Sequence, residues 1–322
     1  MQATFTRGGL LLAFLAQHQV MDMTGQAETV RLLCKACRND AFTDEEISLG
    51  NIDRRNVIPL LSGSRPHDLE LSSRLTDFQL PQAGVKEAAI HLPLLPPPCK
   101  WANFSFSAPS LNAIKAVAMQ DVAAGSYVST DDALSALIWL CITRSRLPRL
   151  GTASTTTLGR TVDARRLFQV PRMYSGEVAQ KVFVTRHATD FVRDPLGSLA
   201  SRLRAEADPN TSSIASDMQA RASALQQAKD KSSVSATKKL DTSTDAMLKS
   251  WAKFDLHSLD FGLGLGCPES VRRPRFVQAE GILYLIPKTP DGEITVAMCL
   301  REEDMGWRRM DKAWVQYAEC LG

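Results

Sequence analysis

The sequence predicts an α/β protein in which mixed strands and helices pack as a sandwich. Its 322 residues are 44% hydrophobic and 23% charged, a balance typical of a globular chain with a sizeable core and about two domains. Apolar runs with strand and helix periodicity follow one another without strict alternation. That irregular order argues against a Rossmann fold and a TIM barrel, in which strands and helices alternate.

Charge and cysteine usage exclude several classes of protein. The 38 Lys and Arg residues against 35 Asp and Glu residues leave a net charge of +3, so we expect no nucleic-acid partner. An odd number of cysteines, 7 in all, cannot all pair within one molecule, which favours a reducing compartment, the cytoplasm. Cys34 and Cys37 have the spacing of half a zinc site, but no second half follows, so we expect no metal.

The first elements are a strand and a helix. The apolar run over 8–16 follows Arg7 as in a secretory signal, but it lacks the small residues of a cleavage site. It is also too short to cross a bilayer, so we expect no membrane association and interpret the run as a fully buried strand. Val30, Leu33 and Cys34 then share helical spacing and predict a helix over 25–38.

The next segment predicts a connection between two lobes. From 41 to 74 the apolar pattern is irregular. The prolines between Pro81 and Pro98 cannot sustain a helix or a central strand, so this stretch is interpreted as a crossover linker.

The rest of the chain predicts alternating short elements. Ser129 or Thr130 caps a strongly apolar helix that contains Trp139. The turn Pro290-Asp291-Gly292 joins two apolar strands as a hairpin. The expected elements are strands over 103–107, 155–162, 178–185, 282–286 and 294–300, helices over 110–119 and 133–144, mainly surface helix over 198–249, and a short helix around Trp314.

One histidine is placed for chemistry. Among the 5 histidines, only His18 lies where an apolar strand stops before a turn and a carboxylate, in the order His18-Gln19-Val20-Met21-Asp22. A neutral imidazole with a pKa near 6.5 can accept a proton at pH 7. The alternative is structural: His18 is a strand-end residue, and Asp22 only caps the following helix.

Several catalytic signatures are absent. The chain has no G-x-S-x-G elbow, no phosphate-binding G-x-x-x-x-G-K-[ST] loop and no H-E-x-x-H zinc helix. Asp260-Phe261-Gly262 imitates the kinase D-F-G motif, but no glycine-rich ATP loop or H-R-D precedes it. The glycines over 262–266 also miss the dinucleotide-binding spacing, which leaves a flexible turn as the plain interpretation.

The early HxxxD and the late DFGxG together resemble the BAHD acyltransferases, and among them the fungal trichothecene O-acetyltransferase-like branch. The resemblance runs over essentially the whole chain and is carried by 8–25, TDDALSALIW (130–139), VDARR (162–166), DFGLG (260–264) and EEDM (302–305). It implies a chloramphenicol-acetyltransferase-like, two-lobed mixed-sheet sandwich with a channel between the lobes. The implied domains are 1–91, the remainder of the N-terminal lobe; 92–108, a Pro-rich crossover linker; and 109–322, the C-terminal lobe.

The resemblance also implies a reaction. His18 would be the general base that takes the hydroxyl proton of a small-molecule alcohol as it attacks acetyl-CoA, with no permanently bound cofactor. Asp22 would point away from the channel and pair with Arg165 on a strand of the other lobe. In the DFGxG turn, Asp260, Gly262 and Gly264 would be structural, although Leu263 replaces the family's tryptophan. Likewise, Met23 replaces the glycine that follows HxxxD in the family.

Coenzyme A contacts are expected at two places. Ser129 and Thr130 offer hydroxyl and backbone N–H groups at a helix start, where the dipole favours phosphate. Arg272 and Arg273 follow the glycine turn and supply charge. The alternatives are ordinary helix capping and a solvated basic surface.

The N-terminus departs from the family pattern. Only 17 residues precede His18, whereas family members carry several strands and helices there. We therefore expect a truncated member with an incomplete first lobe, acting as a monomer. The alternatives are a non-catalytic remnant, a fragment that needs a partner, and a condensation-type domain, which would show a second histidine where Gln17 stands. The catalytic hypothesis requires His18 to face a tunnel shared by two halves of the molecule.

Overall fold

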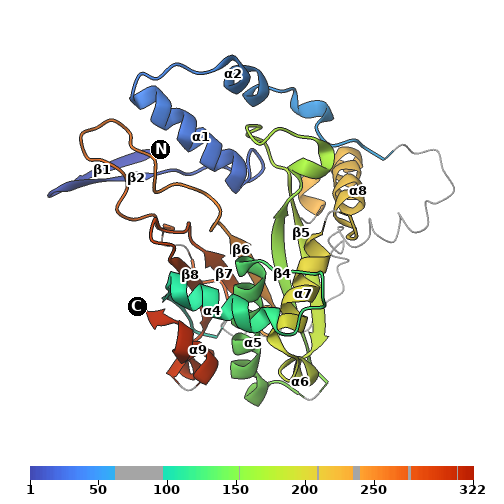
Figure 1. The fold of residues 1–322 in the computed structure, drawn as a ribbon. Coiled ribbons are helices and arrows are strands. Elements are labelled where there is room, and N and C mark those ends of the chain that lie inside the picture. The colour runs from blue at the N-terminus through green and yellow to red at the C-terminus, as the bar shows by residue number, and fades with distance from the viewer. Residues whose placement is uncertain (62–96, 152, 209, 235–239, 275–276, 310) are drawn as a thin grey trace, which may run out of the picture.

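A seven-stranded mixed sheet organises the chain in the computed structural model, which describes all residues except 62–96, 152, 209, 235–239, 275–276 and 310 (Figure 1). Its strand order is β5-β4-β6-β7-β8-β3-β9. The strands β4, β6 and β7 run parallel to one another, and the remaining pairs are antiparallel. The strands are β3 (Cys99–Phe106), β4 (Thr155–Asp163), β5 (Ala179–His187), β6 (Ala246–Ser250), β7 (Ile282–Leu285), β8 (Ile294–Arg301) and β9 (Glu319–Cys320).

Helices α4 (Ala108–Met119), α5 (Thr130–Arg146) and α7 (Leu196–Ala207) cover one face of the sheet and enclose the main core with it. Helix α5 is apolar on all sides and buried along most of its length, as expected of a helix at the centre of a core. Its Trp139 packs against Phe191, and the indole N–H donates a 2.9 Å hydrogen bond to Thr156 of β4. The sheet face opposite these helices is the one that bears on the site.

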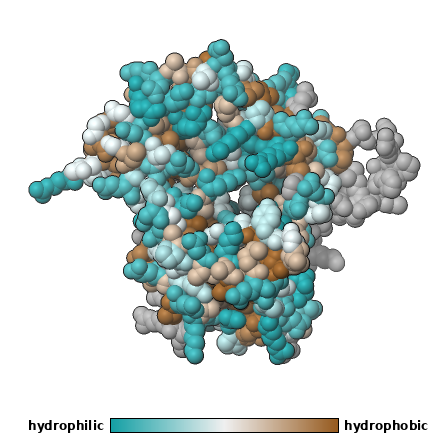
Figure 2. All heavy atoms as spheres, viewed as in Figure 1, coloured by the Kyte–Doolittle hydropathy of each residue, from teal (hydrophilic) through white to brown (hydrophobic). Residues whose placement is uncertain are grey.

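The remaining elements surround this sandwich. The N-terminal strands β1 (Gln2–Thr6) and β2 (Gly9–Ala13) form a separate two-stranded sheet beside α1 (Met23–Cys37), and α2 (Asp44–Gly50) follows. Helix α8 (Ile214–Gln227) packs against the edge strand β5. The shorter helices are α6 (Ala188–Phe191), α9 (Lys312–Tyr317), η1 (Arg54–Asn56), η2 (Leu147–Arg149), η3 (Arg165–Phe168), η4 (Lys231–Ser233) and η5 (Asp304–Arg309). Figure 2 shows this side of the molecule, with hydrophilic residues over α1 and α2 and a hollow between them and the helices below.

The DFGxG loop joins the N-terminal elements to the rest of the molecule. The ring of Phe261 stacks on Phe14 with centroids 6.2 Å apart. The carbonyl oxygen of Asp260 accepts hydrogen bonds from the Cys34 thiol at 3.0 Å and from Arg38 Nη1 at 2.6 Å. The C-terminal end of α1 is therefore anchored by this loop.

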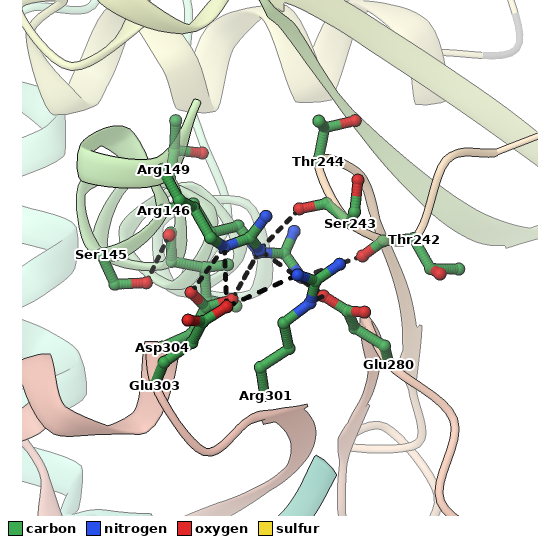
Figure 3. A network of polar contacts seen from close by, with 12 residues as sticks. Ser145, Arg146, Arg149, Thr242, Ser243, Thr244, Glu280, Arg301, Glu303 and Asp304 are labelled. Atoms are coloured by element: carbon green, nitrogen blue, oxygen red, sulfur yellow. Dashed lines mark hydrogen bonds and ion pairs between the residues drawn. The ribbon is translucent and has the colours of Figure 1, made fainter. Parts of the chain in front are cut away.

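A buried network of charged side chains surrounds the C-terminal end of α5 (Figure 3). Arg146, which is 1% exposed, donates to Asp304 at 3.3 Å and to the carbonyl oxygen of Asp245 at 2.9 Å. Arg149 donates to the same Asp304 at 2.7 Å, and Arg301 of β8 pairs with Glu280 at 2.8 Å. Burial lowers the pKa of Arg146, so these carboxylates and carbonyl oxygens are needed to hold its charge. The network ties α5 to the loops before β6 and β7 and to η5.

Most predicted elements are confirmed. The helices expected over 25–38, 110–119 and 133–144 are α1, α4 and α5, and the short helix around Trp314 is α9. The strands expected over 103–107, 155–162 and 178–185 are β3, β4 and β5. The predicted hairpin is formed by β7 and β8, which pair antiparallel.

Four predictions differ from the structure. The apolar run over 8–16 forms a strand only over Gly9–Ala13, and it is only partly buried because β1 is its one partner. Residues 99–106 of the expected linker form β3 inside the main sheet, and 62–96 lie outside the described residues. The irregular segment over 41–74 contains α2, whose Thr43 and Glu46 form a capping box. The segment over 198–249 ends in the core strand β6, and its helix α7 contributes buried residues.

The structure describes no helix whose length and hydrophobicity would let it cross a membrane.

Candidate active site

His18 lies in a turn over 18–20, between β2 and α1. The strand ends at Ala13, so the prediction that His18 stands at the strand end is wrong. A short loop separates the strand from His18. Nδ1 of His18 lies 2.9 Å from Oε2 of Glu177, in the segment before β5. The His18 side chain is 71% exposed, so the described residues do not enclose it in a tunnel as the sequence led us to expect.

The electrostatic surroundings raise the pKa of His18. The hydrogen bond with Glu177 is the largest cause, and the charge of the same carboxylate acts in the same direction. Desolvation of the ring and the charge of Lys249 on β6 oppose the increase. His18 is therefore a stronger base than a free imidazole.

Asp22 has both of the roles that the sequence left open. Its Oδ1 accepts from the backbone N–H of Gly25 at 2.9 Å, which caps α1. The same carboxylate accepts from Arg165 Nη1 at 2.8 Å and from Nη2 at 2.9 Å, and both residues are buried. The ion pair implied by the resemblance is present, but Arg165 lies in η3, just after β4, and not on a strand.

The Asp22–Arg165 pair also holds the segment that carries Glu177. Arg165 Nη2 donates to the carbonyl oxygen of Gly176 at 2.8 Å, and Asp22 accepts from the backbone N–H of Val178 at 2.9 Å. The start of α1 meets this segment so closely that a Cβ on Gly25 would overlap the carbonyl oxygen of Ser175. The two ends of the HxxxD motif therefore contact the same short segment.

Asp163, at the end of β4, extends this polar cluster. Its Oδ1 accepts from Arg165 Nη1 at 3.0 Å, and its Oδ2 accepts from the Thr24 hydroxyl at 3.1 Å. Burial works against the ionised carboxylate, but the charge of Arg165 and its hydrogen bonds keep the pKa of Asp163 below its usual value. Lys253 lies 3.4 Å from Oδ2, on the exposed side of the cluster.

Basic residues close to His18 lie on the sheet face opposite α4, α5 and α7, which we call the open face. Leu248 and Leu283 point into the core, so their strand neighbours Lys249 and Tyr284 point to the opposite face, where they pair in register. Lys249 Nζ lies 3.4 Å from the Tyr284 hydroxyl. Lys181 of β5 is on the same face; burial, with repulsion from Arg221 and Lys249, lowers its pKa to about 8.

The residues expected to contact coenzyme A lie on different sides of the sheet. Arg273 stacks on the rings of Tyr284 and Trp101, at 4.0 and 4.7 Å, on the open face. Ser129 and Thr130 begin α5, which covers the other face, and the Ser129 hydroxyl donates to Asp132 at 2.6 Å. Carboxylates of the chain itself therefore occupy this helix start.

Arg272, the fourth of these residues, is exposed, and its Nη1 donates to the carbonyl oxygen of Val271 at 3.0 Å.

The DFGxG residues form a turn at the far end of α1. Asp260 Oδ1 accepts from the Gly262 N–H at 2.8 Å. Gly262 and Gly264 have φ values of +68° and +75°, in the left-handed region that favours glycine. The turn contacts Cys34 and Arg38, in the last turn of α1 and just after it, whereas His18 precedes the start of this helix.

No group of three His, Cys, Asp or Glu side chains in the described part of the chain is arranged to hold a metal ion. Cys34 is buried and Cys37 is exposed, so the two cysteines of the CxxC spacing face different surroundings.

Sequence reasoning missed Glu177, Asp163 and Lys249. Glu177 carries no local signal because its partner His18 is 159 residues away. The sequence did contain a signal for Lys249. It interrupts an apolar run, and its alternation with Leu248 is typical of a strand with one polar face, whereas we predict surface helix for this segment.

Comparisons with known proteins agree across the whole chain. The sequence profile of the Transferase family matches residues 1–308. The chain is 41% identical to the O-acetyltransferase dmxR13 of Cryptosporiopsis sp. (strain 8999), over 100% of this chain and 69% of that protein. It is 42% identical to the trichothecene 3-O-acetyltransferase TRI101 of Fusarium sporotrichioides, over 100% of this chain and 68% of that protein.

A solved structure supports the same assignment. The crystal structure of F. sporotrichioides TRI101 complexed with coenzyme A and T-2 matches with a TM-score of 0.87 at 40% identity, covering 100% of this chain and 70% of that one. The fold is therefore the mixed α/β, chloramphenicol-acetyltransferase-like fold that the resemblance implied. On this evidence the chain belongs to the Transferase family, the BAHD acyltransferases.

Proposed function

We propose that the chain transfers an acetyl group from acetyl-CoA to a hydroxyl group of a small secondary metabolite, with His18 as the general base. The observation that carries the proposal is the exposed imidazole of His18, anchored at 2.9 Å by Glu177 beside the basic open face of the sheet. The described residues do not form the tunnel that the sequence led us to require, and the proposal instead rests on direct access of both substrates to a side chain that is 71% exposed.

The proposed chemistry is a direct transfer. The imidazole takes the hydroxyl proton as the alcohol oxygen attacks the thioester carbonyl carbon, so a C–O bond forms. The tetrahedral intermediate then breaks its C–S bond, and the departing thiolate of coenzyme A receives the proton from the imidazolium. General-base assistance of this kind contributes about 10² to 10⁴ in rate.

The substrate classes come from the relatives. The two proteins named above are an O-acetyltransferase and a trichothecene 3-O-acetyltransferase, and TRI101 was crystallised with coenzyme A and T-2. We therefore assign acetyl-CoA as the donor and a hydroxylated fungal metabolite as the acceptor. The 7 free cysteines fit a reducing compartment, so we place the reaction in the cytoplasm. We also propose that the chain acts as a monomer.

Coenzyme A requires cations for its phosphates, and the open face offers them. Arg273 and Lys249 lie over the same Tyr284 ring, at 4.0 and 5.3 Å from its centroid, and Lys249 is close enough to His18 to affect its pKa. We propose that these two side chains bind the phosphates. Arg272 adds charge nearby in the chain, whereas Ser129 and Thr130 serve first as the start of α5.

Asp22 and Arg165 are the architectural part of this proposed site. Their buried pair orients the start of α1 and the segment around Glu177, which places His18 without contact between the pair and substrate. The carbonyl oxygen of Asp260 anchors the C-terminal end of α1, and Gly262 and Gly264 shape the turn that presents it.

The exposure of His18 also favours a second candidate, a chain that is active only with a partner. Phe5 and Leu11 are 83% and 63% exposed on opposite faces of the N-terminal sheet, so both of its faces present apolar side chains that a partner could cover. A partner that also covers His18 would exclude water from the reacting groups.

Thiol release and product mass together test the function. The purified chain is mixed with acetyl-CoA and a panel of hydroxylated sesquiterpenoids, and free thiol and acetylated product are measured. Transfer to at least one alcohol supports the proposal. Thiol release without acetylated product means hydrolysis and overturns transfer by this chain alone. If neither occurs until a partner protein is added, the second candidate is favoured.

A further inference from the structure

The contact between Glu177 and His18 assigns a role to a residue that no sequence motif singled out. Oε2 of Glu177 lies 2.9 Å from Nδ1 of His18, and the carboxylate is 25% exposed beneath an imidazole that is 71% exposed. We infer that Glu177 is a positioning residue, which holds His18 with its proton on Nδ1 and leaves Nε2 to accept the proton of the acceptor hydroxyl. This inference rests on the proposed function.

The hydrogen-bonding capacities of the two groups determine the tautomer. An ionised carboxylate can only accept hydrogen bonds, so the nitrogen facing it must carry the hydrogen. A neutral imidazole has one N–H and one acceptor nitrogen. With Nδ1–H donating to Glu177, the acceptor is Nε2.

The backbone around Glu177 is clamped on both sides. Arg165 binds the carbonyl oxygen of Gly176 at 2.8 Å, and Asp22 binds the N–H of Val178 at 2.9 Å. The carboxylate therefore projects from a segment that two buried charged side chains hold in place. The Nδ1–H of His18 donates to this anchored carboxylate, and the hydrogen bond orients the His18 ring.

Cations from three elements face this pair. Lys181 of β5 and Arg221 of α8 interact electrostatically with Glu177, and Lys249 of β6 interacts with His18. Lys249 disfavours the imidazolium. The hydrogen bond and charge of Glu177 outweigh Lys249, since the pKa of His18 is raised overall.

The substitution Glu177→Gln separates charge from shape. The glutamine is isosteric and its carbonyl oxygen still accepts a hydrogen bond, but the negative charge is gone. The pKa of His18 then falls, so the acidic limb of the kcat/KM profile moves to lower pH, by roughly half a unit for a partly exposed pair. The plateau of that profile falls roughly tenfold because the base is weaker and less firmly oriented. Glu177→Asp keeps the charge and restores part of the limb position.

The experiment has two readouts on the full chain. NMR titration of the His18 imidazole, assigned with His18→Ala, measures its pKa in the wild type, Glu177→Gln and the exposed control Glu45→Gln on α2. The pH profile of acetyl transfer is measured for the same proteins. We expect a lower His18 pKa and a shifted limb in Glu177→Gln only.

The outcomes distinguish this inference from the proposed function. An unchanged His18 pKa in Glu177→Gln overturns the inference, whether or not the chain turns over. A shifted pKa with an unshifted limb also overturns it, because His18 would then not be the titrating base that Glu177 controls. A wild type without transfer overturns the proposed function, while the titration still decides whether the charge of Glu177 acts on His18.

Discussion

The carboxylate of Asp22 binds both terminal nitrogens of Arg165, at 2.8 and 2.9 Å, across 143 residues of sequence. Both residues are buried, and the pair links the start of α1 to η3 and to the segment before β5. The two ends of the HxxxD motif thus differ: Asp22 is enclosed and fully hydrogen-bonded, whereas His18 is exposed.

We expect Asp22→Ala to lower the free energy of unfolding by about 3 to 5 kcal/mol, because buried Arg165 loses its bidentate partner and keeps only Asp163, and α1 loses its N-cap. Urea denaturation measures the change. The matched control is Asp53→Ala, which breaks an exposed pair with Arg55 and should cost at most about 1 kcal/mol. Equal losses in the two variants would contradict a buried structural role.

His18→Ala should strongly reduce turnover while the fold is kept. The side chain is 71% exposed, so its truncation should change stability by less than about 0.5 kcal/mol. The rate of acetyl transfer should fall by about 10² to 10⁴ if the imidazole is the general base. Thermal unfolding and the thiol-release assay on one preparation check both, and a large loss of stability would assign His18 a structural role instead.

Gly25→Ala should destabilise the protein by about 1 to 3 kcal/mol, because the added Cβ overlaps the carbonyl oxygen of Ser175. Gly50→Ala in α2 is the control: no heavy atom lies within 4 Å of its added Cβ. There alanine should be neutral or stabilising by up to about 1 kcal/mol. Denaturation midpoints of both variants, measured beside the wild type, test the close approach of α1 to the 174–176 segment.

Glu46 should make stability depend on acid pH. Hydrogen bonds from Lys35, from the Thr43 backbone and from Arg31 lower its pKa from 4.5 to about 2. A lowered carboxyl pKa stabilises the fold above pH 4.5, and this contribution disappears as the pH falls from 4.5 through 2. Glu46→Gln should therefore be less stable than the wild type at pH 7, with the difference closing toward pH 2. Glu45→Gln should show no such convergence.

Lys249→Met and Arg273→Met should each raise the KM for acetyl-CoA by roughly tenfold, since each removes a cation from the proposed phosphate contacts. Arg272→Met should have a smaller effect because Arg272 is exposed and does not stack on Tyr284. The exposed Lys312→Met in α9 controls for net charge. Steady-state kinetics at two ionic strengths would show whether the loss is local, and an unchanged KM for both variants would remove them from the donor site.

The sequence alone determined the local structure of most strands and helices of the main sheet and its covering layer, and the residues of the HxxxD motif. Ser129, Asp132 and an apolar run around Trp139 predict helix α5, because capping and hydrophobic periodicity act within one helix. The hairpin at Gly292 and the Asp22–Arg165 pair, the latter through family resemblance, were also foreseen.

The tertiary structure alone decided the burial of β2, the inclusion of 99–106 in the sheet and the surroundings of His18. The strand pattern over 9–13 is the same whether a strand has one partner or two, and only the assembled sheet sets its exposure. Glu177 meets His18 because Arg165 and Asp22 clamp a distant segment against α1. Local patterns report which residues are apolar or capping, whereas contacts between distant segments arise only when the elements pack together.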